Sequence, residues 1–212
     1  LSTTAYGFLT DDFKWYNIAA AQTIESQTSY AESNKLISFY GRLNYNYGGR
    51  YLFTATVRRD GSSRFGKDNR WGTFPSFAGS WRISQEKFFK SNIISNLKLR
   101  ASWGITGNQE IGNYNSISTL GAQSWGYIFG GAKTTVVLPQ QYANPDLKWE
   151  STSQTDIGLD FGILNNRIRG SIDWYYKKTK DLLLTVAVPS PSLITSQLAN
   201  VGAVRNTGLE IE

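Results

Sequence analysis

The sequence predicts an all-β fold, in which antiparallel strands form a segment of a transmembrane β-barrel with long extracellular loops. Apolar and polar residues alternate along several stretches with the two-residue period of a strand. The connections between these stretches are short and long in turn, which is typical of the two ends of an outer-membrane barrel. The 7 Trp, 12 Tyr, 11 Phe and 20 Gly residues favour strands and tight turns over helices.

The alternation is clearest between Leu97 and Thr106. The apolar residues of this stretch would share one face of a strand: Leu97, Leu99, Ala101, Trp103 and Ile105. Its other face would carry Lys98, Arg100 and Ser102. The remaining strands are predicted at 38–46, 51–58, 77–84, 156–162, 168–177 and from Val204 onward.

Connection lengths divide the predicted sheet into a compact end and an outer end. At the compact end, residues 47–50 and 164–167 are tight turns built on Gly48-Gly49 and Asn165-Asn166, and Gln85 to Ile94 is expected to form about one or two helical turns. The long connections are 59–73, 107–149 and 178–203. Alternate connections of an antiparallel meander lie at opposite ends of the sheet, so the long ones are expected to share the outer end.

Aromatic residues are expected to form two belts at the membrane surfaces. The belt at the compact end would contain Tyr45, Tyr47, Tyr51 and Trp81. The belt at the outer end would contain Phe74, Phe77, Trp103, Trp174 and Tyr176. Charges of both signs would face a wet interior: Arg42, Arg82, Lys98, Arg100, Asp156, Asp160, Arg169 and Asp173.

A soluble all-β glycan-binding module is the alternative, with the aromatic residues filling a core or forming a platform. Alternation of period two does not separate it from a barrel wall. The two differ in what lies against the apolar face, which would be lipid in a barrel and a second sheet in a soluble module. Leu97, Leu99, Ile157 and Phe161 are the residues that test this difference.

Composition excludes several classes of function. The chain has no Cys, Met or His, so the usual ligands of zinc, copper and iron are missing, as are histidine acid–base chemistry and a cysteine nucleophile. We therefore assign no catalytic residue, metal site or cofactor, and we expect the chain not to be an enzyme. The net charge of +6 is scattered along the chain, which argues against nucleic acid as a partner.

Several motifs, taken in order, resemble those of SusC/RagA-type TonB-dependent outer-membrane transporters. The motifs are VRRDGSSRFG at 57–66, WGTFPS at 71–76, WRIS at 81–84, LKLRASWG at 97–104, TGNQ at 106–109, NPDLKWE at 144–150, YYKKTKDLL at 175–183, and NVG with VRNTGLE at 200–210. They cover residues 36–212, and Tyr6 to Tyr30 resembles the preceding outer loop. The order of the motifs makes the resemblance specific.

The resemblance implies a barrel of about 22 strands that is closed by an N-terminal plug. This chain would supply about seven of those strands. Residues 1–35 would form an extracellular loop and 36–212 part of the barrel, in the outer membrane of a Gram-negative bacterium and in contact with its lipid. Such transporters import oligosaccharides or peptides, work with a SusD-like surface lipoprotein as a lid, and are powered by TonB–ExbB–ExbD. The plug and TonB box are expected to lie in a longer protein of which this chain is a piece.

The long connection 107–149 is the best candidate for ligand contact. Its amides suit hydroxyl groups or peptide bonds, and its aromatic rings suit sugar rings. The candidate ligand-binding residues are Asn108, Gln109, Trp125, Tyr127 and Tyr142. Alternatively, the aromatic residues only pack the loop on itself. The charged cluster at 58–70 likewise has two interpretations, a rim for an anionic partner or a loop held by its own Asp–Arg pairs.

Overall fold

The structure is a computed structural model, and it describes residues 2–8, 10 and 17–212. The chain divides into two compact units, Leu1–Ser33 and Asn34–Glu212. In the first unit, strand β1 (Ser2–Tyr6) pairs with β2 (Thr23–Thr28) in an antiparallel hairpin, which includes the short 3-10 helix η2 (Ile18–Ala20). The sheet that carries the predicted pattern belongs entirely to the second unit.

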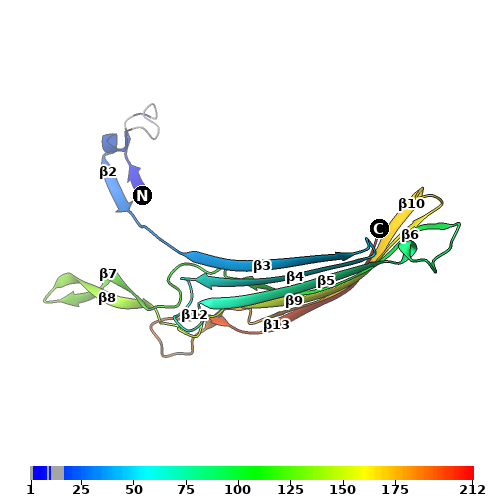
Figure 1. The fold of residues 1–212 in the computed structure, drawn as a ribbon. Helices are drawn as coiled ribbons and strands as arrows, with labels where there is room; N and C mark the ends of the chain where they lie inside the picture. The colour runs from blue at the N-terminus through cyan, green and yellow to red at the C-terminus, as the bar shows by residue number, and fades with distance from the viewer. Residues whose placement is uncertain (1, 9, 11–16) are drawn as a thin grey trace. The chain divides into compact units, whose positions relative to one another are not determined.

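Seven antiparallel strands form this sheet in the order β13-β10-β9-β6-β5-β4-β3, and Figure 1 shows them side by side in one curved layer. The strands are β3 (Leu36–Tyr47), β4 (Tyr51–Ser62), β5 (Trp71–Arg82), β6 (Ile94–Asn108), β9 (Glu150–Ile163), β10 (Ile168–Lys180) and β13 (Ala203–Ile211). A strand is present at each predicted place, and several are longer than expected at the outer end. Strand β5, for example, begins at Trp71 because residues 71–76 pair with the end of β4. The strand predicted at 77–84 ends two residues early, at Arg82, where the 3-10 helix η3 (Ile83–Gln85) begins.

The long connections at the outer end contain hairpins of their own. Residues 109–149 contain β7 (Thr119–Phe129) and β8 (Ala132–Gln141), which meet at Gly130 and Gly131 with φ of 59° and 81°. Residues 181–202 contain β11 (Leu183–Ala187) and β12 (Ser196–Asn200). Periodicity in the loops is too irregular to predict these pairs, although a connection of this length commonly carries structure of its own.

The turns at the compact end follow the predicted chemistry. Gly48 and Gly49 adopt φ of 59° and 67°, which suits glycine between β3 and β4. Asn165 and Asn166 occupy the left-handed region between β9 and β10, where asparagine is tolerated better than most residues. The helical stretch expected within Gln85–Ile94 was placed slightly wrongly, since the 3-10 helix η3 spans Ile83–Gln85 and the backbone is extended at Glu86.

Glu86 follows that helix, and its carboxylate is bound at the rim of the sheet. The Arg50 guanidinium lies 2.9 Å from Glu86 Oε2, and Trp81 Nε1 donates to Glu86 Oε1 at 3.0 Å. A hydrogen bond from the Tyr51 hydroxyl, together with those from Trp81 and Arg50, lowers the pKa of the Glu86 carboxyl below its ordinary value. Glu86 thus joins the turn after β3 to the connection between β5 and β6.

One face of the seven-stranded sheet is apolar. It carries the odd-numbered positions of β3–β6, β9 and β13 and the even-numbered positions of β10, as the register shows. Leu99 and Ile157 on this face keep 38% and 46% of their surface exposed. Within the described residues 34–212, the other sheets are the two-stranded hairpins β7–β8 and β11–β12, which belong to the connections at the outer end. An open face of this kind fits a barrel wall in lipid and not a soluble sandwich.

Aromatic rows cross the apolar face at the compact end and near the middle of the strands. At the compact end, Tyr51 stacks on Trp81 with ring centroids 6.3 Å apart. Further out, Phe77 stacks on Trp103 at 6.0 Å. The prediction that Phe74 belongs to the outer belt is wrong. Phe74 has an even-numbered position on β5, so its ring points to the polar face. There it packs edge-on against Trp149 at 5.3 Å.

Within the described part of the chain, no helix is long and apolar enough to cross a membrane.

Candidate functional site

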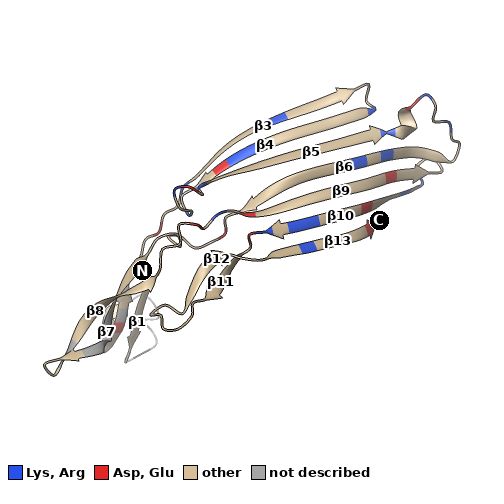
Figure 2. Cartoon of the chain, turned by 90° about the horizontal axis from the view of Figure 1, so that it is seen from below, with Lys and Arg blue, Asp and Glu red and all other residues tan. Residues whose placement is uncertain are grey.

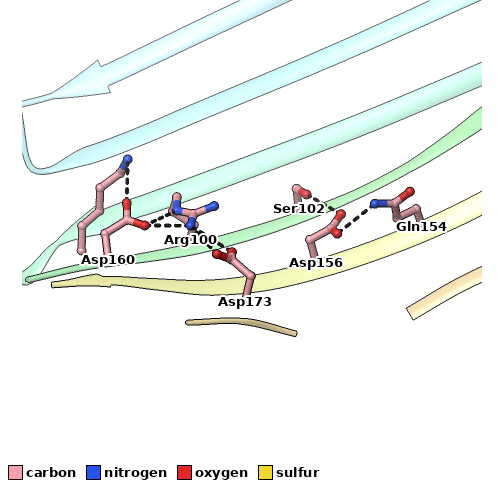
Figure 3. A network of polar contacts seen from close by, with 7 residues as sticks. Arg100, Ser102, Gln154, Asp156, Asp160 and Asp173 are labelled. Atoms are coloured by element: carbon pink, nitrogen blue, oxygen red, sulfur yellow. Dashed lines mark hydrogen bonds and ion pairs between the residues drawn. The ribbon is translucent and has the colours of Figure 1, made fainter. Parts of the chain in front are cut away.

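The polar face of the sheet is the opposite one, with even-numbered positions on β3–β6, β9 and β13 and odd-numbered positions on β10. Figure 2 shows basic and acidic residues distributed along these strands. An ion network crosses β6, β9 and β10 (Figure 3), in which Arg100 Nη2 lies 2.7 Å from Asp160 and 2.9 Å from Asp173. Lys98 Nζ lies 3.4 Å from Asp160.

A second group lies further out on the same face. Ser102 Oγ donates to Asp156 at 3.2 Å, and Gln154 Nε2 donates to the other oxygen of Asp156 at 2.9 Å (Figure 3). Both groups remain partly exposed, as charged side chains lining water would be. The inward position predicted for Lys98, Arg100, Asp156, Asp160 and Asp173 agrees with this arrangement.

Gly158 provides the space that the ion network needs. Arg100 on β6 reaches across β9 to Asp173 on β10, and it passes over Gly158. A Cβ atom at this position would clash with Asp173 Oδ1 and lie 2.8 Å from Arg100 Nη2. The bridge over three strands therefore depends on a residue without a side chain.

We expect Gly158→Ala to destabilise the folded barrel by about 1–2 kcal/mol, because it displaces charge-assisted hydrogen bonds that partial exposure already weakens. Denaturant unfolding of the full-length protein in bilayers measures this. Gly79→Ala is the matched control, since a Cβ on Gly79 meets nothing within 4 Å. Equal midpoints for both variants would show that the network contributes nothing to stability.

The buried core of the chain lies at the outer end, among the connections. Phe65, Ile111, Leu147 and Trp149 form this cluster, which we call the loop anchor. Leu147 is fully buried, and the Trp149 ring lies 5.3 Å from that of Phe65. These residues come from three separate segments, so the anchor holds the loops around one apolar centre.

Hydrogen bonds complete the loop anchor. Trp149 Nε1 donates to the carbonyl of Arg70 at 3.0 Å. The Asn200 side chain accepts from the backbone N–H of Lys148 at 2.9 Å and donates to its carbonyl at 2.8 Å. Asn69 Nδ2 donates to the Pro145 carbonyl at 3.2 Å. Several of the motifs that carry the family resemblance meet here, and their role in this structure is to fix the loops.

Most of the charged cluster at 58–70 holds the protein's own loops. Arg58 Nε lies 2.7 Å from Asp60, whose side chain is only 8% exposed. Arg64 donates to the Gln109 carbonyl at 3.1 Å and to the Asn113 side chain at 3.2 Å. The contacts of these residues support the interpretation of a loop held by internal pairs. Arg58 remains half exposed, so it is still accessible on the polar face.

A hollow of about 440 Å³ opens between the polar face and the loop anchor. Six of the residues around it define its chemistry: Thr56, Arg58, Asp60, Phe74, Asn108 and Gln109. We call this space the outer hollow. Gln109 Oε1 is itself buried beneath the surface, and it accepts no hydrogen bond from any described residue. The hollow thus offers the Asn108 amide, hydroxyl and charged groups, and the Phe74 ring.

Residues 2–212 match the family model described as "TonB dependent receptor-like, beta-barrel". The chain belongs to this family of TonB-dependent receptors. TonB-dependent receptor SusC of Bacteroides thetaiotaomicron is 48% identical over 192 residues, which are 88% of this chain and 19% of SusC. TonB-dependent receptor P3 of Formosa agariphila is 39% identical over 207 residues, or 97% of this chain and 20% of that protein.

Solved structures agree with the sequence relatives. The RagAB peptide transporter superposes with a TM-score of 0.82 at 34% identity, over 97% of this chain and 22% of the solved chain. The siderophore receptor PirA from Pseudomonas aeruginosa, at 15% identity and a TM-score of 0.55, shares the fold alone. This TonB-dependent receptor chain spans about a fifth of the length of the curated relatives it matches.

Two of the five predicted ligand-binding residues of this TonB-dependent receptor chain lie together. Asn108 and Gln109 both line the outer hollow, and Asn108 Nδ2 donates to Glu150 at 3.4 Å. Tyr142 is not among the residues that line it, and its hydroxyl lies 3.4 Å from Ser192 Oγ. Trp125 and Tyr127 fall on β7, but their side chains lie outside the described residues.

The sequence did not indicate Thr56 and Phe74 as ligand-contact residues. Both line the outer hollow, and both belong to the sheet. Thr56 lies on the polar face of the predicted strand 51–58, so the alternation of that strand already indicated its direction. Phe74 breaks the pattern, as an aromatic residue at an even-numbered position of β5. Only the packing against Trp149 explains that exception.

Proposed function

We propose that this chain forms part of the wall and the extracellular loops of a nutrient importer in the outer membrane of a Gram-negative bacterium. The observation that carries the proposal is the two-faced sheet: one face is open and apolar, and the other holds an ion network suited to water. Membership of the TonB-dependent receptors supports coupling to TonB–ExbB–ExbD through parts of a longer protein. The similarity to SusC and RagAB supports a SusD-like surface lipoprotein as lid.

The outer hollow is the proposed contact site for the imported molecule. The exposed Asn108 amide suits a hydroxyl or a peptide group, and the Phe74 ring suits an apolar face of either ligand. Oligosaccharides and peptides both offer such groups, and one solved relative is the RagAB peptide transporter. The proposed site residues are Asn108 and Gln109, with Trp125, Tyr127 and Tyr142 proposed on the surrounding loop.

The proposed role of the chain is transport and not catalysis. The curated relatives are named as receptors. The aspartates of the polar face that belong to the network are paired with Arg100 and Lys98, which holds them as structural anions. Among the described residues, no group of three or more acidic side chains is placed to hold a metal ion.

Uptake measurements on cells that express the full-length receptor test the proposal. Deleting its gene should abolish growth on either a set of oligosaccharides or a set of oligopeptides, and the wild-type gene should restore it. Asn108→Leu should raise the half-saturating substrate concentration about five-fold, the value of one hydrogen bond near 1 kcal/mol. Gln85→Leu at the compact end is the control. Unchanged growth on all these substrates after deletion would refute the importer.

A further inference from the structure

The connection between β5 and β6, residues 83–93, combines exposed apolar and basic side chains at the compact end. Phe88 and Ile93 are 68% and 62% exposed. Lys87 and Lys90 beside them are exposed as well. Figure 2 shows charged residues of both signs on this connection. Large apolar side chains next to lysines on one short segment suit the boundary between lipid and water.

Packing places this connection on the lipid side of the rim. The Phe88 ring lies 6.4 Å from that of Trp81, which belongs to the apolar face. Glu86 is bonded to Trp81 and to Arg50, so the segment just before Phe88 is fixed against the same rim. Tyr51 and Trp81 form the aromatic row at the compact end, and such rows mark the level of lipid headgroups. The lysines therefore lie near headgroup level.

The positive charges of Lys87 and Lys90 are available to an external partner. Glu86, the acidic residue within it, is ionised and bound by Arg50, Tyr51 and Trp81. In the described part of the chain, neither Lys87 nor Lys90 forms an ion pair. The nearby Arg82 guanidinium faces the Gly49 carbonyl at 3.5 Å, which leaves the surroundings basic.

We propose that the β5–β6 connection binds an anionic phospholipid of the surrounding membrane. The ammonium groups of Lys87 and Lys90 contact the lipid phosphate, while Phe88 and Ile93 lie among the acyl chains. The proposal rests on the membrane location given under the proposed function. It goes beyond that location by naming a lipid class and the residues that recognise it.

Native mass spectrometry of the full-length receptor in detergent tests this binding, with titration of phosphatidylglycerol and, separately, of phosphatidylcholine. The double variant K87Q/K90Q should raise the dissociation constant for the first bound phosphatidylglycerol about 25-fold, from a factor near five for each lysine at a lipid surface. Its affinity for phosphatidylcholine should not change. K35Q/K67Q is the matched control, because Lys35 and Lys67 are exposed at the outer end.

Equal phosphatidylglycerol affinities of the two double variants would overturn the lipid site. Binding of inorganic phosphate with the same dependence on the lysines, without lipid retention, would overturn it in favour of a soluble anion. Failure of this inference is distinguishable from failure of the proposed function. A receptor that inserts and imports its substrate but shows no lysine-dependent lipid affinity contradicts only the lipid site.

Discussion

Replacing Trp149 with alanine is expected to release the outer loops while the strands of the barrel stay paired. The Trp149 side chain is buried between Phe65 and Phe74, and its loss should destabilise the loop anchor by about 3–5 kcal/mol. The hydrogen bond to the Arg70 carbonyl is lost as well. Hydrogen exchange on the full-length receptor in bilayers should show the protection of residues 62–70 and 144–149 falling, with the sheet unaffected.

Two further variants make the Trp149 experiment specific. Trp149→Phe keeps a ring but removes the indole N–H, so it should cost only about 1 kcal/mol. Tyr30→Ala removes an aromatic side chain that is 82% exposed, and it should leave the anchor unchanged. If Trp149→Ala left the exchange of both loop segments as in the wild type, the cluster would not be what holds them.

Arginine on the apolar face is expected to prevent efficient insertion, and arginine on the polar face is not. The row Phe53, Gly79, Ala101, Ile157, Trp174 lies two residues further along the strands than the row of Tyr51 and Trp81, so Ile157 belongs to the lipid-facing band. Ile157→Arg should cost about 2–4 kcal/mol of folding free energy in a bilayer. Leu99→Arg should cost less, since Leu99 pairs with Trp81 in the row at the membrane surface.

Ser102→Arg is the control for the opposite face. Ser102 pairs with Asp156 across β6 and β9, so an arginine there gains an acidic neighbour in water. Refolding of the full-length receptor into lipid vesicles from denaturant measures all three variants. Similar folding free energies for Ile157→Arg and Ser102→Arg would contradict the assignment of the faces and reopen the soluble interpretation.

The strands and their two faces were predictable because the side-chain period of a strand is two and the turns have distinct chemistry. Leu97 to Thr106 sets one strand and both of its faces, and the Gly48-Gly49 turn sets the register of the β3–β4 hairpin. The loop anchor was not predictable in this way. Phe65, Ile111 and Leu147 are far apart in sequence, and no local periodicity relates them.

The same distinction, between local pattern and long-range contact, separates the candidate site residues that were predictable from those that were not. Asn108 and Gln109 follow directly from a well-predicted strand, and the structure brings them together at its outer end. Tyr142 follows an irregular hairpin, and its position depends on long-range contacts such as that with Ser192. The two sheet residues that complete the hollow, Thr56 and Phe74, belong to neighbouring strands, so only the pairing of the sheet relates them to Asn108.

The loop anchor encloses the base of the β7–β8 hairpin. Ile111 precedes the hairpin, while Leu147 and Trp149 follow it, and all three are buried in the same cluster. The chain is thereby clamped on both sides of residues 119–141, whatever their sequence. A change in the length or sequence of the hairpin tip is therefore expected to leave the loop anchor beneath it in place.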